Sequence, residues 1–212
     1  MSDKIVGRAL RSTVTDGGEL VLSIEPVEVR APGSNEVVVC VGAAPVNPSD
    51  LRVLLAGGDV GRAVADDGAI RIPLGPRAVA AAAARAGRPM TAGNEGAGVV
   101  VATGDSPAAQ ALAGRVVATF AGGGTYGTHV TVPADRCLPL ADGTDPRDAA
   151  SAFVNPLTAL GMVDTMRLEG HTALVHTAAA SNLGQMLNRL CIAEGVPLVA
   201  IVRRADQAEL LR

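Results

Sequence analysis

The last third of the chain alternates between segment types in a way that few folds accommodate. Apolar strands are predicted over residues 172–175 and 197–202, and a helix over residues 182–194 lies between them. A turn of small residues leads into this helix, and Gly195 follows it at the position of a C-cap. Parallel strands need a long crossover, and a strand–helix–strand unit of about 30 residues provides one. The sequence therefore predicts the start of a parallel α/β domain.

The chain before residue 146 follows a different pattern. Short runs rich in β-branched residues, such as 36–42 and 97–102, are separated by Gly and Pro turns. Such spacing favours a β-barrel or sandwich over a parallel sheet. Pro76 and the alanines after it predict a helix to Ala86, although a low-complexity linker is the alternative. We therefore predict an α/β protein with a β-rich part over residues 1–146 and the start of a parallel βαβ domain over 147–212.

Composition excludes several classes of function. The net charge is −3, and the aromatic residues are one Tyr and two Phe. Such a chain lacks both the basic surface and the stacking platforms of nucleic-acid-binding proteins. We predict no membrane partner, because no apolar run reaches the roughly 18 residues of a membrane span. The N-terminus shows no signal peptide, so we expect a cytoplasmic protein.

The cysteines and histidines do not form a metal-binding pattern. Cys40, Cys137 and Cys191 are far apart, and no CxxC motif occurs. This pattern predicts neither a disulfide framework nor a zinc ribbon. The three histidines have no metal-ligand spacing either, so we expect no metal site.

The small-residue turn before the predicted helix is a candidate phosphate-binding site. A dinucleotide site needs a sharp turn, a close approach of the backbone to the pyrophosphate, and free N–H groups at a helix N-terminus. The alternative is a turn that merely packs a helix against a strand. The candidate cofactor-binding residues of the turn are Ala178, Ser181, Asn182, Leu183 and Gly184.

Two arginines after the second predicted strand indicate which nucleotide would bind. An acidic residue at this position selects NAD by accepting hydrogen bonds from the adenosine ribose. Here the residues are Arg203 and Arg204, and arginine can grip a 2′-phosphate through paired N–H donors. A solvated basic turn is the alternative. With the small-residue turn upstream, we favour NADPH as the cofactor.

The chain as a whole resembles the medium-chain dehydrogenase/reductase superfamily, in its zinc-independent, quinone-oxidoreductase-like branch. The resemblance implies a GroES-like β-barrel domain followed by a Rossmann domain that is incomplete here. The segments that carry it, in family order, are Val46–Asp50, Gly93–Gly98, Gly114–Ala118 with Gly124–Tyr126, Asn155–Met162 and the predicted βαβ unit.

The resemblance also bears on zinc and on catalysis. Zinc-dependent members of the family place Cys, His and Cys where this chain has Asn47, Asn94 and about Val154. Amide and alkyl side chains cannot replace these ligands, since zinc prefers thiolate and imidazole donors. The resemblance implies that Asn47 and Thr158 line the nicotinamide end of the cleft.

The remaining candidate catalytic residues are Asp50 and Tyr126. The resemblance places Tyr126 near the cleft or at the domain junction. Asp50 is either a general acid or a cap for the turn or helix that follows it. Related enoyl-thioester reductases carry a tyrosine acid soon after this segment, where this chain has Leu54, Leu55 and glycines. The function implied is NADPH-dependent hydride transfer to a quinone, enone or similar carbonyl compound of small size.

The Rossmann domain of the family needs about six strands, and the chain supplies two, so on the order of 120 further residues are expected elsewhere. We therefore predict a truncated chain that forms a homodimer or takes the missing strands from a complementing chain. Two other classes of function stay open: a non-catalytic cofactor-binding family member, and one subunit of a split two-chain enzyme. The sequence does not identify the substrate.

Overall fold

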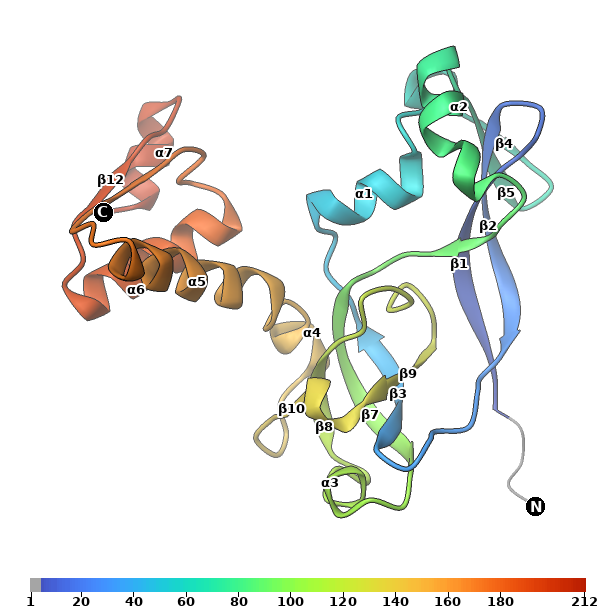
Figure 1. The fold of residues 1–212 in the computed structure, drawn as a ribbon, viewed down its shortest axis with the longest axis horizontal. Helices are drawn as coiled ribbons and strands as arrows, with labels where there is room; N and C mark the ends of the chain where they lie inside the picture. Colours follow the sequence, from blue (N-terminus) through green and yellow to red (C-terminus); the bar gives the residue numbers. More distant parts are fainter. Residues whose placement is uncertain (1–4) are drawn as a thin grey trace. The chain divides into compact units, whose positions relative to one another are not determined.

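The computed structural model describes residues 5–212, which form two compact units divided after Ser151 (Figure 1). The first unit is built mainly from β-strands, and the second contains a parallel βαβ arrangement. The predicted fold class is therefore confirmed. The domain boundary after residue 146 stays a prediction, and the two compact units of the structure divide five residues later, after Ser151.

The first unit contains two five-stranded sheets. The first sheet has the order β4-β5-β2-β1-β6 and the second has the order β10-β8-β7-β3-β9. The strands of the first sheet are β1 (Val6–Val14), β2 (Glu19–Glu28), β4 (Val64–Asp66), β5 (Ala69–Pro73) and β6 (Met90–Thr91). Those of the second are β3 (Glu36–Ala43), β7 (Glu95–Thr103), β8 (Val116–Phe120), β9 (His129–Pro133) and β10 (Cys137–Pro139).

The two sheets meet through a single β-bridge between Ala9 and Gly127, and over the described residues the strand ladder does not close into a continuous barrel. Each sheet buries its own aliphatic cluster. Val14, Leu20 and Ile72 belong to the first cluster, and Val37 and Val117 belong to the second. β-Branched residues fill these cores because they pack well on a pleated surface.

The helices of the first unit share one way of starting. A proline occupies the first turn of α1 (Pro48–Leu55), α2 (Pro76–Ala82), α3 (Pro107–Gln110) and α4 (Pro146–Ala149). Proline suits this place because its fixed φ is helical and its missing N–H would have no acceptor there. The 3₁₀ turns are η1 (Val60–Arg62), η2 (Ala83–Arg85) and η3 (Ala134–Arg136). The predicted helix over 76–86 is thus α2 continued by η2.

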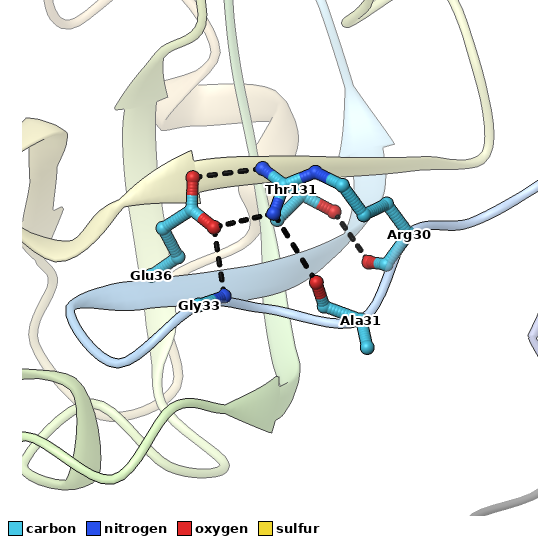
Figure 2. Close-up of polar contacts among 5 residues, drawn as sticks. All are labelled: Arg30, Ala31, Gly33, Glu36 and Thr131. Carbon is cyan, nitrogen blue, oxygen red and sulfur yellow. Dashed lines mark hydrogen bonds and ion pairs between the residues drawn. The ribbon is translucent and has the colours of Figure 1, made fainter.

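An ion pair between Arg30 and Glu36 stabilises the turn over residues 30–36, which leads into β3. The Arg30 guanidinium donates to both Glu36 carboxylate oxygens, at 2.6 and 2.8 Å, and the Gly33 N–H donates to one of them at 2.7 Å (Figure 2). The Thr131 hydroxyl on β9 donates to the Arg30 carbonyl oxygen at 3.0 Å. The hydrogen bond from Arg30, followed by that from Gly33, lowers the pKa of Glu36 to about 2. These contacts fix the turn over residues 30–36 against β9.

The second unit contains α5 (Val154–Leu168), β11 (Leu174–His176), α6 (Asn182–Glu194), β12 (Leu198–Ala200) and α7 (Ala205–Leu210). β11 and β12 are parallel, as predicted, and begin somewhat later than the sequence indicates. α6 has the predicted bounds, and Gly195, which has a φ of 65°, is its C-cap. The core between α5 and α6 includes Val163, Leu187 and Cys191.

Candidate functional site

In the first unit, a buried carboxylate organises the start of α1. Asp50 is 2% exposed and accepts four hydrogen bonds. Its Oδ2 accepts from the Asn47 N–H and the Tyr126 hydroxyl, both at 3.0 Å. Its Oδ1 accepts from the N–H of Asn94 at 3.2 Å and from the side-chain amide of the same residue at 2.8 Å. An ionised carboxylate has acceptor sites for all four donors.

Asn47 is fixed by a second buried carboxylate. Its side-chain Nδ2 donates to Glu95 Oε1 at 2.9 Å, and the two residues are 5% and 1% exposed. The Thr125 hydroxyl donates to the Glu95 carbonyl oxygen at 2.7 Å. The amide of Asn47 therefore has a defined orientation, because a carboxylate accepts only from its nitrogen end.

The Tyr126 hydroxyl lies between two acceptors. Its Oη is 2.9 Å from the Pro45 carbonyl oxygen and 3.0 Å from Asp50 Oδ2. Burial, and then the negative charge of Asp50, raises the pKa of Tyr126. Gly93 makes this packing possible: it has a φ of 87°, and a Cβ there would lie 2.6 Å from the Tyr126 nitrogen.

The three predicted catalytic residues thus belong to one hydrogen-bonded cluster, which also contains Asn94 and Glu95. We call these five residues the α1 cluster. Asn94 and Glu95 both lie in the sequence segment Gly93–Gly98. The resemblance of this segment to the family indicates only that Asn94 stands where a zinc ligand would be, and it does not indicate the hydrogen bonds of either residue. Their partners lie more than 40 positions earlier in the chain, at Asn47 and Asp50. Such pairings depend on the sheet topology.

In the second unit, a cavity of about 470 Å³ opens at the N-terminus of α6. The turn over 177–181 forms one wall, and Ile201 to Arg203 with Gln207 form the other. Backbone hydrogen bonds join the two walls, since the Ile201 N–H donates to the His176 carbonyl at 2.9 Å and the Ala179 N–H donates to the Ile201 carbonyl at 3.3 Å. The predicted small-residue turn therefore borders an open space beside β12.

The turn packs closely against the start of α6. Ser181 caps α6 by accepting from the Gly184 N–H at 3.1 Å, which leaves the first-turn N–H groups of Asn182 and Leu183 without helical acceptors. A Cβ on Gly184 would lie 2.2 Å from the Ala179 carbonyl oxygen. Ala178 has a φ of 54°, a conformation that costs an L-residue energy.

The two candidate arginines differ in their surroundings. Arg203 lines the cavity, and its backbone N–H donates to the Gln207 side-chain oxygen at 3.1 Å. Arg204 is paired with Asp206 through two hydrogen bonds of 3.0 Å. Hydrogen bonding to Asp206 raises the pKa of Arg204 and lowers that of Asp206. Of the two arginines, Arg203 lines the cavity, and Arg204 is held in an ion pair with Asp206.

The side chains of two predicted cofactor residues contact other parts of the second unit. The Thr158 hydroxyl donates to the Val154 carbonyl oxygen at 2.5 Å, and Thr158 lines a different cavity beside Met162 and Leu174. Leu183 packs its side chain against the core of α5 and α6, so only its main chain is available at the turn. The role predicted for Asn47 and Thr158 at the nicotinamide ring stays a prediction.

Over residues 5–212, no group of three or more His, Cys, Asp or Glu side chains is placed to hold a metal ion. The amides of Asn47 and Asn94 are instead used as hydrogen-bond donors to carboxylates. None of the helices in this range is long and apolar enough to cross a bilayer.

Comparison with known proteins agrees with this architecture. Residues 33–142 match the alcohol dehydrogenase GroES-like domain. The mitochondrial enoyl-[acyl-carrier-protein] reductase of Xenopus tropicalis is 28% identical over 194 residues, which are 91% of this chain and 49% of that protein. The chain thus spans about half the length of the curated relatives it matches.

Solved structures show the same fold. A candidate NADPH:quinone reductase from Mesorhizobium loti has a TM-score of 0.70 and 30% identity, covering 100% of this chain and 58% of that one. A mycobacterial protein complexed with NADPH has a TM-score of 0.69 and 23% identity, covering 97% of this chain and 56% of that one, and shows likeness of fold alone. The GroES-like match, the two-sheet unit and the βαβ unit together show that this chain belongs to the medium-chain dehydrogenase/reductase superfamily.

Proposed function

We propose that the protein containing this chain is an oxidoreductase that uses NADPH to reduce a quinone, an enone or a similar carbonyl compound without zinc. The observation that carries the proposal is the cavity at the N-terminus of α6, with Arg203 in its wall. Relatives named as oxidoreductases support the general class of reaction.

The residues of the α6 cavity fit the phosphate groups of a dinucleotide. The first-turn N–H groups and the helix dipole favour a pyrophosphate, and Gly184 lets the helix start close to the turn. Arg203 would bind the 2′-phosphate through paired N–H groups of its guanidinium, each donating to a phosphate oxygen. NADPH supplies a hydride when bound, and the protein supplies binding and orientation.

We propose that Asp50 and Tyr126 of the α1 cluster position other residues and do not transfer a proton. Asp50 already accepts four hydrogen bonds, and the Tyr126 phenol has a raised pKa, so neither is suited to donate a proton near neutral pH. Their contacts instead hold Asn47 and the start of α1. In this proposal, solvent provides the proton that follows hydride transfer.

Independence from zinc is supported by the α1 cluster. Asn47 and Asn94 stand where zinc-dependent enzymes of the superfamily have ligands, and each amide already donates to a carboxylate. Amide nitrogens that donate hydrogen bonds offer no lone pair to a metal.

Reduction of an enoyl thioester is a second candidate, because several curated relatives carry the name enoyl-[acyl-carrier-protein] reductase. The segment after α1 holds no tyrosine that could act as acid. Turnover assays with a quinone and with an enoyl thioester would separate the two candidates. Nucleotide binding without turnover of either would favour a non-catalytic protein, or one subunit of a split enzyme.

The cofactor site is tested by titrating NADPH and NADH into the protein and its Arg203→Gln variant, with binding followed by thermal shift. We expect Arg203→Gln to weaken NADPH binding about tenfold, the effect of losing a charge-assisted hydrogen bond, and to leave NADH binding unchanged. Arg204→Gln is the matched control and should change NADPH affinity much less, because Asp206 already occupies this guanidinium. Equal losses of NADPH and NADH affinity in Arg203→Gln would contradict a 2′-phosphate contact.

A further inference from the structure

A cavity of about 500 Å³ in the first unit lies apart from the residues assigned above. α1 and the segment from α2 to β6 line it, and both helices lie at the same end of the first sheet (Figure 1). Two arginines, Arg52 and Arg85, contribute to its wall, and no acidic side chain does. Two cations and no anion among the lining residues favour an anionic ligand in the cavity.

Arg85 is held in place by the protein itself. Its guanidinium donates to the Val53 carbonyl oxygen at 3.0 Å and to the hydroxyl of Ser12 at 3.2 Å. Ser12 is 0% exposed and donates in turn to the Val53 carbonyl at 2.8 Å. Burial lowers the pKa of Arg85. A guanidinium has five N–H donors, so these contacts orient the group and leave donors for a further acceptor.

Neither arginine has a carboxylate partner within residues 5–212. Arg85 is half-buried and Arg52 is exposed on the same helix as the α1 cluster. A partly desolvated cation without a counter-ion is costly, and an anionic ligand would remove that cost. The remaining wall is largely apolar, with Val53, Ala82 and Met90 among its residues.

The cavity is connected to the α1 cluster through Ser49. Ser49 lines the cavity, and its hydroxyl oxygen accepts from the side-chain amide of Asn94 at 3.2 Å. The same amide donates to Asp50. A molecule in this cavity would therefore have its anionic end at the arginines and lie beside the polar start of α1.

We propose that this cavity, with Arg52 and Arg85, binds a carboxylate or phosphate group at the end of a short aliphatic chain on the substrate. The inference rests on the proposed function, since it names the substrate class of that enzyme as an anionic amphiphile. Arg85 and Ser12 form the fixed part of the site, and Arg52 completes it from α1.

The test uses NMR titration of the protein in the absence of nucleotide, with crotonate, butyl phosphate and crotonamide as probes. We expect one or both anions to shift the amide resonances of Ser49, Arg52 and Arg85, and crotonamide to bind about tenfold more weakly. The anion that binds more tightly identifies the head group. Arg52→Gln should weaken binding of that anion about tenfold as well.

Arg77→Gln, an exposed arginine of α2 outside the cavity wall, controls for the loss of one positive charge and should leave anion binding unchanged. Equal affinity for crotonate and crotonamide, or equal anion affinity of Arg52→Gln and Arg77→Gln, would overturn the proposal. Arg85→Lys keeps the positive charge and removes the planar guanidinium. Weaker anion binding by this variant would support a role of the paired N–H donors of Arg85, and unchanged binding would count against it. NADPH binding is measured separately in the second unit, so failure of one proposal is distinguishable from failure of the other.

Discussion

At the scale of one residue, Gly184 shows how closely the turn and α6 must approach. A Cβ there would lie 2.2 Å from the Ala179 carbonyl oxygen, which neither backbone can avoid without moving. We expect Gly184→Ala to destabilise the protein by about 1–3 kcal/mol, the usual cost of overpacking. Chemical denaturation of the variant would measure this loss.

Gly161 is the matched control because it lies inside α5 and a Cβ there would meet nothing within 4 Å. Gly161→Ala should stabilise the protein by about 1 kcal/mol through helix propensity. If Gly184→Ala and Gly161→Ala both raised the free energy of unfolding, the contact between Gly184 and the Ala179 carbonyl would be less tight than the structure indicates.

Tyr126 offers a second measurement at this scale. It is the only tyrosine and there is no tryptophan, so phenolate absorbance reports this residue alone. Burial and Asp50 raise its pKa in the folded state. Its contribution to stability is therefore complete below the ordinary tyrosine pKa of about 10 and declines as the pH rises above it.

We expect Tyr126 to ionise only at a pH above the ordinary tyrosine range, and Asp50→Asn to move its titration back toward that range. Glu95→Gln, which removes the carboxylate that accepts from the Asn47 side chain, serves as the control and should move the titration less, since Asp50 is the charge that raises the Tyr126 pKa. An ordinary tyrosine titration in the folded wild-type protein would contradict the buried phenol.

At the scale of an element, the ion pair of Arg30 and Glu36 anchors the turn before β3. The pKa of Glu36 is lowered to about 2, so its stabilising contribution is present above its ordinary pKa of about 4.5 and is lost as the pH falls toward about 2. Glu36→Gln should therefore lower the melting temperature at neutral pH, and the difference from the wild type should shrink at acidic pH.

Glu19→Gln is the control, because Glu19 lies 3.6 Å from Arg71 in a longer, exposed contact. It should change the melting temperature less than Glu36→Gln at neutral pH, because Glu36 accepts short hydrogen bonds from both Arg30 and Gly33 whereas the contact of Glu19 is a single longer ion pair. If the melting temperature of Glu36→Gln stays below that of the wild type by the same amount as the pH falls, the carboxylate charge does not stabilise this turn.

At the scale of the whole molecule, each unit has its own aliphatic core. Leu187 is 1% exposed in the core of α5 and α6, and Leu20 is 0% exposed in the first sheet of the other unit. Truncation of a buried leucine to alanine costs about 2–5 kcal/mol. Leu187→Ala should therefore reduce amide protection mainly over residues 154–200, and Leu20→Ala mainly over residues 6–28 and 64–91.

Hydrogen exchange measured by mass spectrometry would map both losses, and each variant serves as the control for the other. Loss of protection across both units in either variant would mean that the two cores unfold as one cooperative body.

Most of the local structure was predictable because it depends on neighbouring residues. Pro76 at a helix start, Gly195 at a helix end and the β-branched run over 36–42 act through φ angles, caps and side-chain packing. The α6 bounds and the parallel pairing of β11 with β12 were predicted for the same reason. By contrast, the sequence pattern left a barrel and a sandwich both open, and only the structure shows that the strands of the first unit form two separate sheets.

The sequence by itself determined the fold class, the order of elements and the small-residue turn at α6, since these follow from periodicity and from the backbone preferences of Gly, Pro and Ala. Only the tertiary structure placed Asn94 and Glu95 beside Asn47 and Asp50, and brought Arg85 to Ser12 and Val53. It also paired Arg204 with Asp206 and placed Arg203 in the wall of the α6 cavity. Apart from the Arg204 pair, these contacts join residues 32 to 73 positions apart. Contacts at such separations are set by how strands and helices pack, which local propensity does not encode.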